Sequence, residues 1–362
     1  MERVTDTNRT FPKQSSDMAK GIAILFMLFY HLFSVPTDNA IMQVNYSPLS
    51  EDVFLTIAKF GNICVPVFIF LTSYGISRKI FAKDDMTLKE AYNGTWKRAG
   101  MLLLRFLFMF AFVNLIWFRC FNYALCYGEG KQGVLAFITD ALGLSHFFGT
   151  PSLNMTWWYM SVAYTLVFIV PVLAHLCKKT GSPFLGIAFL IPFLLPVEFD
   201  IARYFFVIGF GIFAAYENLF ERIINSKFPF VLRWIIEIAF IILCIPARQN
   251  EFVQEHLVYL FDAVIAFGIV LFAADFIAAV PGLRNVFAFL GKHSMNIFFV
   301  HTFFYLILYR DFVFRFRYAG VTFVILLALS LALSLVLYGL WNLLAFLLGK
   351  LKQKKQAPEG TS

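Results

Sequence analysis

The stretch that decides the fold is residues 321–348, VTFVILLALSLALSLVLYGLWNLLAFLL, which holds 28 consecutive residues without a charged side chain. About 20 apolar residues in helical form cross the hydrocarbon core of a bilayer. The stretch therefore predicts a transmembrane helix. The whole chain follows the same pattern, because 60% of its 362 residues are hydrophobic and 14% are charged. Soluble domains carry about 25% charged residues, so the composition excludes a soluble globular protein.

Hydropathy and helix breakers divide the chain into about ten helical segments, which predicts an all-α, polytopic membrane protein with no separate soluble domain. The segments are residues 20–35, 57–76, 99–118, 156–177, 183–197, 201–216, 230–246, 257–279, 289–309 and 321–348. The longest connection, residues 121–155, contains an apolar stretch too short to span. We expect that stretch to lie along the membrane interface or to re-enter the membrane.

The distribution of Lys and Arg sets the predicted orientation. Loops on one side of the ten segments carry 20 cations and loops on the other side carry seven. Short loops rich in Lys and Arg stay in the cytoplasm, so both termini are predicted to be cytoplasmic. The predicted organisation is a cytoplasmic N-terminal segment (1–19), a transmembrane domain (20–349) and a basic cytoplasmic tail (350–362).

Charge and cysteine usage exclude several other classes. The net charge of +8 is spread over short loops and forms no basic stripe, so we expect no nucleic-acid partner. The five cysteines contain no CxxC pair and no matching histidine spacing, so we expect no metal site, and only Cys120 and Cys126 are placed to form a disulfide. The chain also lacks the GxSxG, P-loop and dinucleotide-binding patterns of common soluble enzymes.

Ionisable residues inside hydrocarbon are costly and therefore mark candidate sites. In the first helix, Lys20 and His31 are 11 residues apart, which places both on one face, with His31 about 16 Å deeper. Asp17 lies one turn before Lys20 and falls near the same line. The low dielectric of this environment disfavours the charged imidazolium, so a neutral His31 is available to accept a proton.

A second histidine is predicted at a similar depth. Ser294 and His301 are seven residues apart in the ninth helix, which also enters from the cytoplasmic side. In the third helix Arg98 and Arg105 share the same spacing, and Lys97 adds a further cation at its cytoplasmic end. The histidines predict a reactive centre, and the cations predict a phosphate-binding rim.

Each of these residue types also has a structural explanation. A lone buried histidine is often a hydrogen-bonded packing residue, and Arg105 can extend its guanidinium back to the headgroups. We expect Arg233 and Glu237, spaced i and i+4, to neutralise each other. Other polar and aromatic residues lie at predicted helix ends: Asp200, Arg203 and Asp262 as solvated caps or acceptor contacts, and Trp157, Trp158 and Tyr159 as an aromatic belt.

Four motifs carry a family resemblance. Residues 16–31, SDMAKGIAILFMLFYH, resemble the first-helix motif of the acyltransferase 3 family, in which a basic residue and a histidine flank ten residues. Residues 60–75 (FGNICVPVFIFLTSYG), 158–162 (WYMSV) and 290–301 (LGKHSMNIFFVH) are similar to later motifs of the same family, in the same order. Lys20 stands where that family often has Arg.

The resemblance implies an integral-membrane O-acyltransferase of the bacterial cell membrane that modifies surface glycans. The implied donor is cytoplasmic acyl-CoA, with acetyl-CoA as the expected form, and no cofactor is permanently bound. The acceptor would be a sugar hydroxyl of a surface polysaccharide or its lipid-linked precursor. On this basis His31 and His301 are the catalytic candidates, and His31 would either take the proton of the attacking hydroxyl or carry the acyl group itself. Lys20, Lys97, Arg98 and Arg105 would bind the donor, and Asp17 and Ser294 would support these residues.

Two other functions remain open at this stage. A transporter or flippase for lipid-linked glycans would use His and Arg to line a path, and internal repeats would favour it; the sequence shows none. A non-catalytic relative would act as a scaffold within the machinery that builds envelope polysaccharide.

Overall fold

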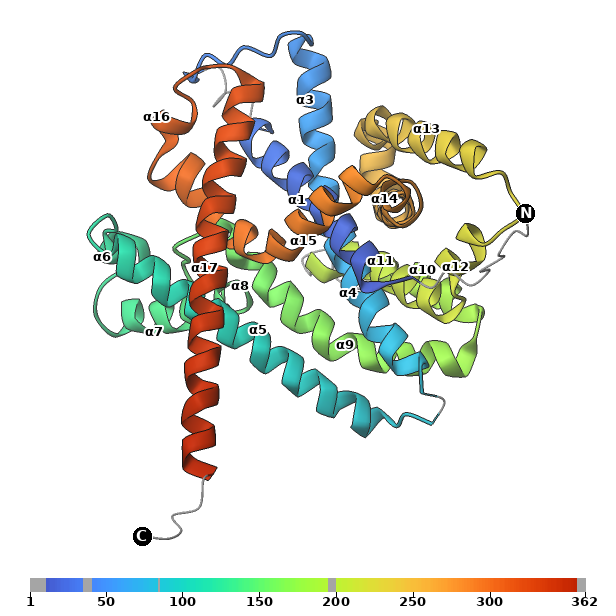
Figure 1. Ribbon diagram of the computed structural model, residues 1–362, viewed down its shortest axis with the longest axis horizontal. Coiled ribbons are helices and arrows are strands. Elements are labelled where there is room, and N and C mark those ends of the chain that lie inside the picture. The colour runs from blue at the N-terminus through green and yellow to red at the C-terminus, as the bar shows by residue number, and fades with distance from the viewer. Residues whose placement is uncertain (1–10, 35–40, 84, 195–199, 357–362) are drawn as a thin grey trace.

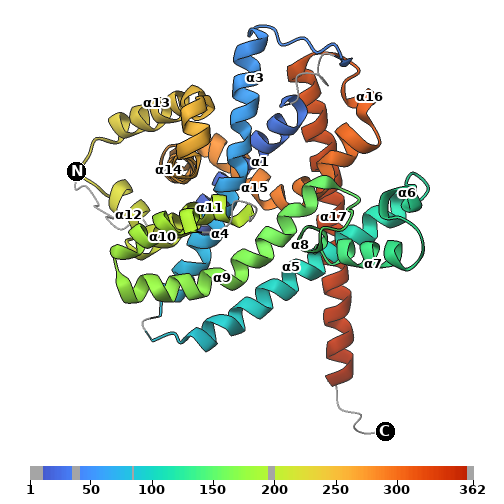
Figure 2. The ribbon, with the colours of Figure 1, turned by 180° about the vertical axis from the view of Figure 1, so that it is seen from behind.

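The computed structural model describes residues 11–34, 41–83, 85–194 and 200–356, and this part of the chain is helical with irregular connections. Figure 1 shows the helices as one bundle, and Figure 2 shows it from behind. The main elements are α1 (Lys13–Phe33), α3 (Glu51–Phe60), η1 (Gly61–Ile63), α4 (Cys64–Phe81), α5 (Leu88–Trp117), α9 (Tyr159–Thr180), α10 (Pro183–Leu194), α11 (Asp200–Tyr216), α13 (Phe230–Gln249), α14 (Val258–Phe272), α15 (Pro281–Thr302) and α17 (Ala319–Gln356).

Shorter elements connect or extend these helices: α6 (Tyr123–Tyr127), α7 (Gly130–Ala141), α8 (Ser145–Phe148), η2 (Met155–Trp158), α12 (Leu219–Ile224), η3 (Val253–Leu257), η4 (Ala273–Ile277), η5 (Phe303–Ile307) and α16 (Arg310–Val313). The helices cover all ten predicted segments as far as the structure describes them. Within the part of the chain that the structure describes, seven helical stretches are long and apolar enough to cross a membrane, whereas α10 and α11 are apolar but shorter. The all-α membrane class is confirmed, and the number ten and the orientation stay predictions.

Helix ends depart from the predicted ones where local capping decides them. The start of α5 lies 11 residues earlier than predicted, because Thr87 and Glu90 form a capping box. The Glu90 amide donates to Thr87 Oγ1 over 3.3 Å, and the Thr87 amide donates to the Glu90 carboxylate over 2.9 Å. These bonds satisfy N–H groups that the first turn of a helix leaves without partners. Helix α1 also begins earlier than predicted, at Lys13, seven residues before the predicted start, although its N-cap residue Pro12 makes no side-chain capping bond.

The closest helix packing joins α1 to α15. A Cβ atom built on Gly21 would lie 2.1 Å from the carbonyl oxygen of Phe287, and one built on Gly291 would lie 1.7 Å from that of Asp17. Only glycine permits this approach, which gains van der Waals contact where lipid offers no hydrophobic driving force. The two helices run in the same general direction from this crossing and carry His31 and His301 at their far ends.

Two buried arginines, Arg233 and Arg248, pair with carboxylates of other helical segments. Arg233 binds Asp275 of η4 through two hydrogen bonds, one of them 2.9 Å between Nη2 and Oδ1. The prediction that Arg233 pairs with Glu237 is therefore wrong, and the Glu237 carboxylate makes no hydrogen bond to the described residues. The fork of the guanidinium matches both oxygens of Asp275, and such a bidentate contact is stronger than a single contact along one helix.

Two residues that were predicted as a solvated helix cap and as part of an aromatic belt, Asp262 and Trp157, are buried in the structure. Asp262 is fully buried and accepts a 2.7 Å hydrogen bond from Arg248, so it is not a solvated cap. The side chain of Asp200 lies outside the described part. Trp157 is buried and donates to the carbonyl of Phe299, because residues 155–158 turn inward as η2. Cys120 and Cys126 are free thiols.

The orientation can be tested with exposed positions at the two ends of α5. Cys120 is exposed and lies on the predicted outer side, so a membrane-impermeant maleimide should label it in intact cells. Lys89→Cys in a background that carries both Cys120→Ser and Cys126→Ser should be labelled only after the membrane is opened, because Lys89 is exposed on the predicted cytoplasmic side. Labelling of Lys89→Cys in intact cells would reverse the predicted topology.

Candidate active site

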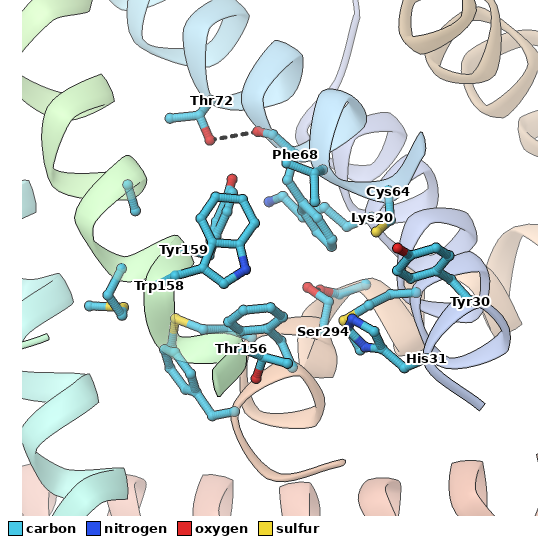
Figure 3. Close-up of a pocket in the computed structure, with 18 of the residues that line it drawn as sticks. Lys20, Tyr30, His31, Cys64, Phe68, Thr72, Thr156, Trp158, Tyr159 and Ser294 are labelled. Atoms are coloured by element: carbon cyan, nitrogen blue, oxygen red, sulfur yellow. Dashed lines mark hydrogen bonds between the residues drawn. The ribbon is translucent and has the colours of Figure 1, made fainter. Parts of the chain in front are cut away.

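A cavity of about 1380 Å³ lies between α1, α4, α5, α9, α11 and α15. Figure 3 shows His31 and Tyr30 of α1 on one side of this space and Trp158 and Tyr159 on the other. Among the described residues that line the cavity, the charged side chains are one carboxylate, Asp17, and five cations: Lys13, Lys20, Arg105, Arg203 and Lys292. The cavity is therefore positively charged and suits an anionic ligand.

Two histidines meet at the wall of this cavity. Nδ1 of His31 lies 2.7 Å from Nε2 of His301, and the two rings are nearly parallel. His31 lines the cavity, whereas His301 is fully buried behind it. Helical spacing predicted that both lie at a similar depth, and the α1–α15 crossing brings them into contact.

Hydrogen-bond chemistry fixes the protons on this pair. Nδ1 of His301 lies 2.8 Å from the carbonyl oxygen of Phe298, which can only accept, so this nitrogen carries a proton. In a neutral His301, Nε2 is then an acceptor and must receive the proton on Nδ1 of His31. Nε2 of His31 remains unprotonated and makes no hydrogen bond to the described residues. The arrangement is a relay from a carbonyl through two imidazoles to one basic nitrogen beside the cavity.

Segment 123–158, which we call the cap, supports the buried end of this relay. Asp140 is buried and accepts four hydrogen bonds, from Tyr127, Ser145 and Ser152 side chains and the Leu153 amide. Burial raises the pKa of Asp140, and the four donors act in the opposite direction. The network connects α6, α7 and α8 to the residues just before η2.

The cap reaches α15 next to His301. Asn154 is fully buried and donates to Thr302 Oγ1 and, over 3.4 Å, to the carbonyl of Phe299. Trp157 Nε1 donates to the same carbonyl over 3.2 Å. The helix changes to π-helical geometry here, and the Phe303 amide bonds the carbonyls of Val300 and His301 in place of that of Phe299. Such changes free a carbonyl for side-chain donors, and here that carbonyl belongs to Phe299. His301 lies between Phe299 and Thr302, the two residues of α15 that Asn154 contacts.

The predicted donor-binding residues divide into two groups. Lys20 and Arg105 line the cavity; Lys20 lies 3.4 Å from Asp17, and the guanidinium of Arg105 lies 5.7 Å from the centre of the Trp341 ring. Lys97 is exposed and Arg98 half-buried, and neither lines the cavity. Ser294 lines it but donates to the carbonyl of Gly291 in its own helix, over 2.8 Å.

Several lining residues were not predicted as part of the site. Lys13 and Lys292 are exposed at the end of the cavity that holds Lys20. Lys13 is seven residues before Lys20, so the helical spacing that selected Lys20 would also have found it if α1 had been extended. No spacing rule reveals His146 of the cap, which lies near Trp158 with 6.0 Å between ring centres.

The family model described as an acyltransferase domain, Acyl_transf_3, matches residues 13–339. The chain therefore belongs to the acyltransferase 3 family, which confirms the resemblance of its motifs. Comparisons with curated proteins and with solved structures gave no match. Family and fold together define a membrane acyltransferase.

Proposed function

We propose that this protein transfers an acyl group, in the first instance acetyl, from cytoplasmic acyl-CoA to a sugar hydroxyl of a surface polysaccharide or its lipid-linked precursor. Its place would be the bacterial cell membrane, beside the machinery that assembles envelope glycans. The observation that carries the proposal is the pair of histidines, which leaves one unprotonated nitrogen, Nε2 of His31, beside a cavity rich in cations.

In the proposed reaction Nε2 of His31 takes the proton of the acceptor hydroxyl as the oxygen attacks the thioester carbonyl. A C–O bond forms and the C–S bond breaks. The proton then passes from His31 to the departing sulfur, which gives the acyl ester and free CoA. His301 stabilises the imidazolium by accepting the hydrogen bond from His31 Nδ1, as the third group does in a serine-hydrolase triad.

The cations have a matching role in donor binding. Lys13, Lys20 and Lys292 lie at one end of the cavity, and clustered cations hold phosphate oxygens through charge-assisted hydrogen bonds. Arg105 extends the positive wall inward. Lys97 and Arg98, which precede Arg105 on α5, would attract the donor at the cytoplasmic surface.

The proposal is tested by acyl transfer with purified protein. Labelled acetyl-CoA and a lipid-linked glycan fraction from the producing cells are incubated in detergent or liposomes, and the labelled ester and free CoA are measured. Equal amounts of both products support the proposal. Movement of lipid-linked glycan across the liposome membrane without ester formation would support the transporter function instead.

Lys20→Ala should raise KM for acyl-CoA about tenfold with little change in kcat. The loss of one charge-assisted hydrogen bond costs about 1.5 kcal/mol, which corresponds to about tenfold in affinity. Lys20→Arg, which keeps the charge, should retain most of the donor affinity. Lys79→Ala removes an exposed cation outside the cavity lining and serves as the control. An unchanged donor KM in Lys20→Ala would remove Lys20 from the donor site.

A further inference from the structure

A separate cationic position lies on the cavity wall formed by α11. Arg203 lines the cavity, and 41% of its side-chain surface is exposed. Its Nη2 lies 3.7 Å from Oδ2 of Asp262, too far for a normal hydrogen bond. No other ion pair joins Arg203 to the described residues.

The carboxylate behind Arg203 is already occupied. Arg248 is buried and donates to Oδ1 of Asp262 over 2.7 Å. Two guanidinium groups therefore share one carboxylate, which leaves one positive charge in excess among these three side chains. Uncompensated charge at membrane depth is costly, and a bound anion lowers that cost.

Helix register places Arg203 at the depth of the histidine pair. The helices α4 and α11 run parallel, because Gly211 packs against Phe70 and Arg78 bonds Asn218 further along. Arg203 is eight residues before Gly211, which puts it level with Asn62. The adjoining Gly61 packs against the turn of α1 that ends next to His31, since a Cβ atom built on it would lie 2.4 Å from the carbonyl oxygen of Phe26 and 3.0 Å from Cβ of Tyr30.

We infer that Arg203 binds an oxyanion, a phosphate or a carboxylate, carried by the acceptor substrate. The assignment of this anion to the acceptor substrate rests on the proposed function. The donor's phosphates are assigned to the cations around Lys20, which lies about 16 Å from His31 along α1. An anion held at the depth of His31 on a different wall therefore belongs to the other substrate. The guanidinium fork suits both oxyanions, and its contact with the acceptor would orient the hydroxyl toward His31.

The test measures binding directly by calorimetric titration of the purified full-length protein with inorganic pyrophosphate or with glucuronate. Saturating free CoA is present throughout to fill the donor site. The wild type should bind at least one probe, and the probe that binds identifies the source as a lipid-linked phosphate or an acidic sugar. Arg203→Gln should weaken that binding about tenfold or more, because a charge-assisted contact is lost.

Two further variants complete the test. Arg203→Lys keeps the charge without the fork and should bind more tightly than Arg203→Gln. Arg222→Gln removes an arginine that pairs with Glu217 outside the cavity lining and should bind like the wild type. The inference is overturned if the wild type binds neither probe with CoA present, if Arg203→Gln binds as well as the wild type, or if Arg222→Gln loses binding equally. None of these readouts needs turnover, so a failure of the proposed reaction would appear separately, in the transfer assay.

Discussion

His31→Ala should lower the rate of acyl transfer about 10²–10⁴-fold, the usual contribution of a positioned general base. The amount of folded protein in the membrane should stay near normal, because His31 borders a cavity and its side chain is only partly buried. The measurement is kcat per folded molecule at saturating donor, with the folded fraction taken from size-exclusion chromatography. The KM for acyl-CoA should change little, since the phosphates are bound elsewhere.

His293→Ala is the matched control for this prediction. His293 is buried, hydrogen-bonds Ser334 over 3.0 Å and does not line the cavity. Its loss should reduce the folded yield and leave the rate per folded molecule unchanged, as expected for a packing residue. Wild-type transfer by folded His31→Ala would exclude His31 from the chemistry and favour the transporter or scaffold functions.

Gly291→Ala should destabilise the fold by about 3 kcal/mol and also reduce transfer by the molecules that fold. The added methyl group would lie 1.7 Å from the carbonyl oxygen of Asp17, a backbone atom that cannot rotate away. The helices α1 and α15 must then separate at their crossing, and overpacking of this kind is costly. Because His301 lies about 15 Å further along α15, the separation would also lengthen its contact with His31.

Gly282→Ala tests whether this effect is specific to the crossing. Gly282 lies in the same helix, and a Cβ atom built on it meets nothing within 4 Å. The variant should match the wild type in the temperature at which the detergent-solubilised protein aggregates and in transfer rate. If Gly291→Ala behaves like Gly282→Ala in both measurements, the close crossing is not what aligns the two histidines.

Structural features that depend on periodicity within one helix could be predicted from the sequence. The length of residues 321–348 predicted α17, and the spacing from Lys20 to His31 placed both on the cavity face of α1. Contacts between helices follow no such period. The partner of Arg233 lies 42 residues away in η4, and only the folded bundle brings Asp275 within reach.

The cap shows a second limit of sequence analysis. Its apolar residues predicted a segment that lies along the membrane interface or re-enters the membrane, but they gave no sign that α6, α7 and α8 are organised around the buried carboxylate of Asp140. Four donors from scattered positions converge there, and no spacing rule connects them. The same applies to Asn154, whose partner Thr302 lies 148 residues further along the chain.

The contact between Asn154 and α15 constrains how such enzymes can be re-engineered. Exchanging the cap between relatives would test whether it contributes to the choice of substrate, because the cap borders the cavity through His146 and Met155. A chimera that imports a new cap without an amide at position 154 and an indole at position 157 would leave the carbonyl of Phe299 without these two donors. Grafts should therefore keep residues 154–157 with the recipient's α15 and exchange only the segment before them.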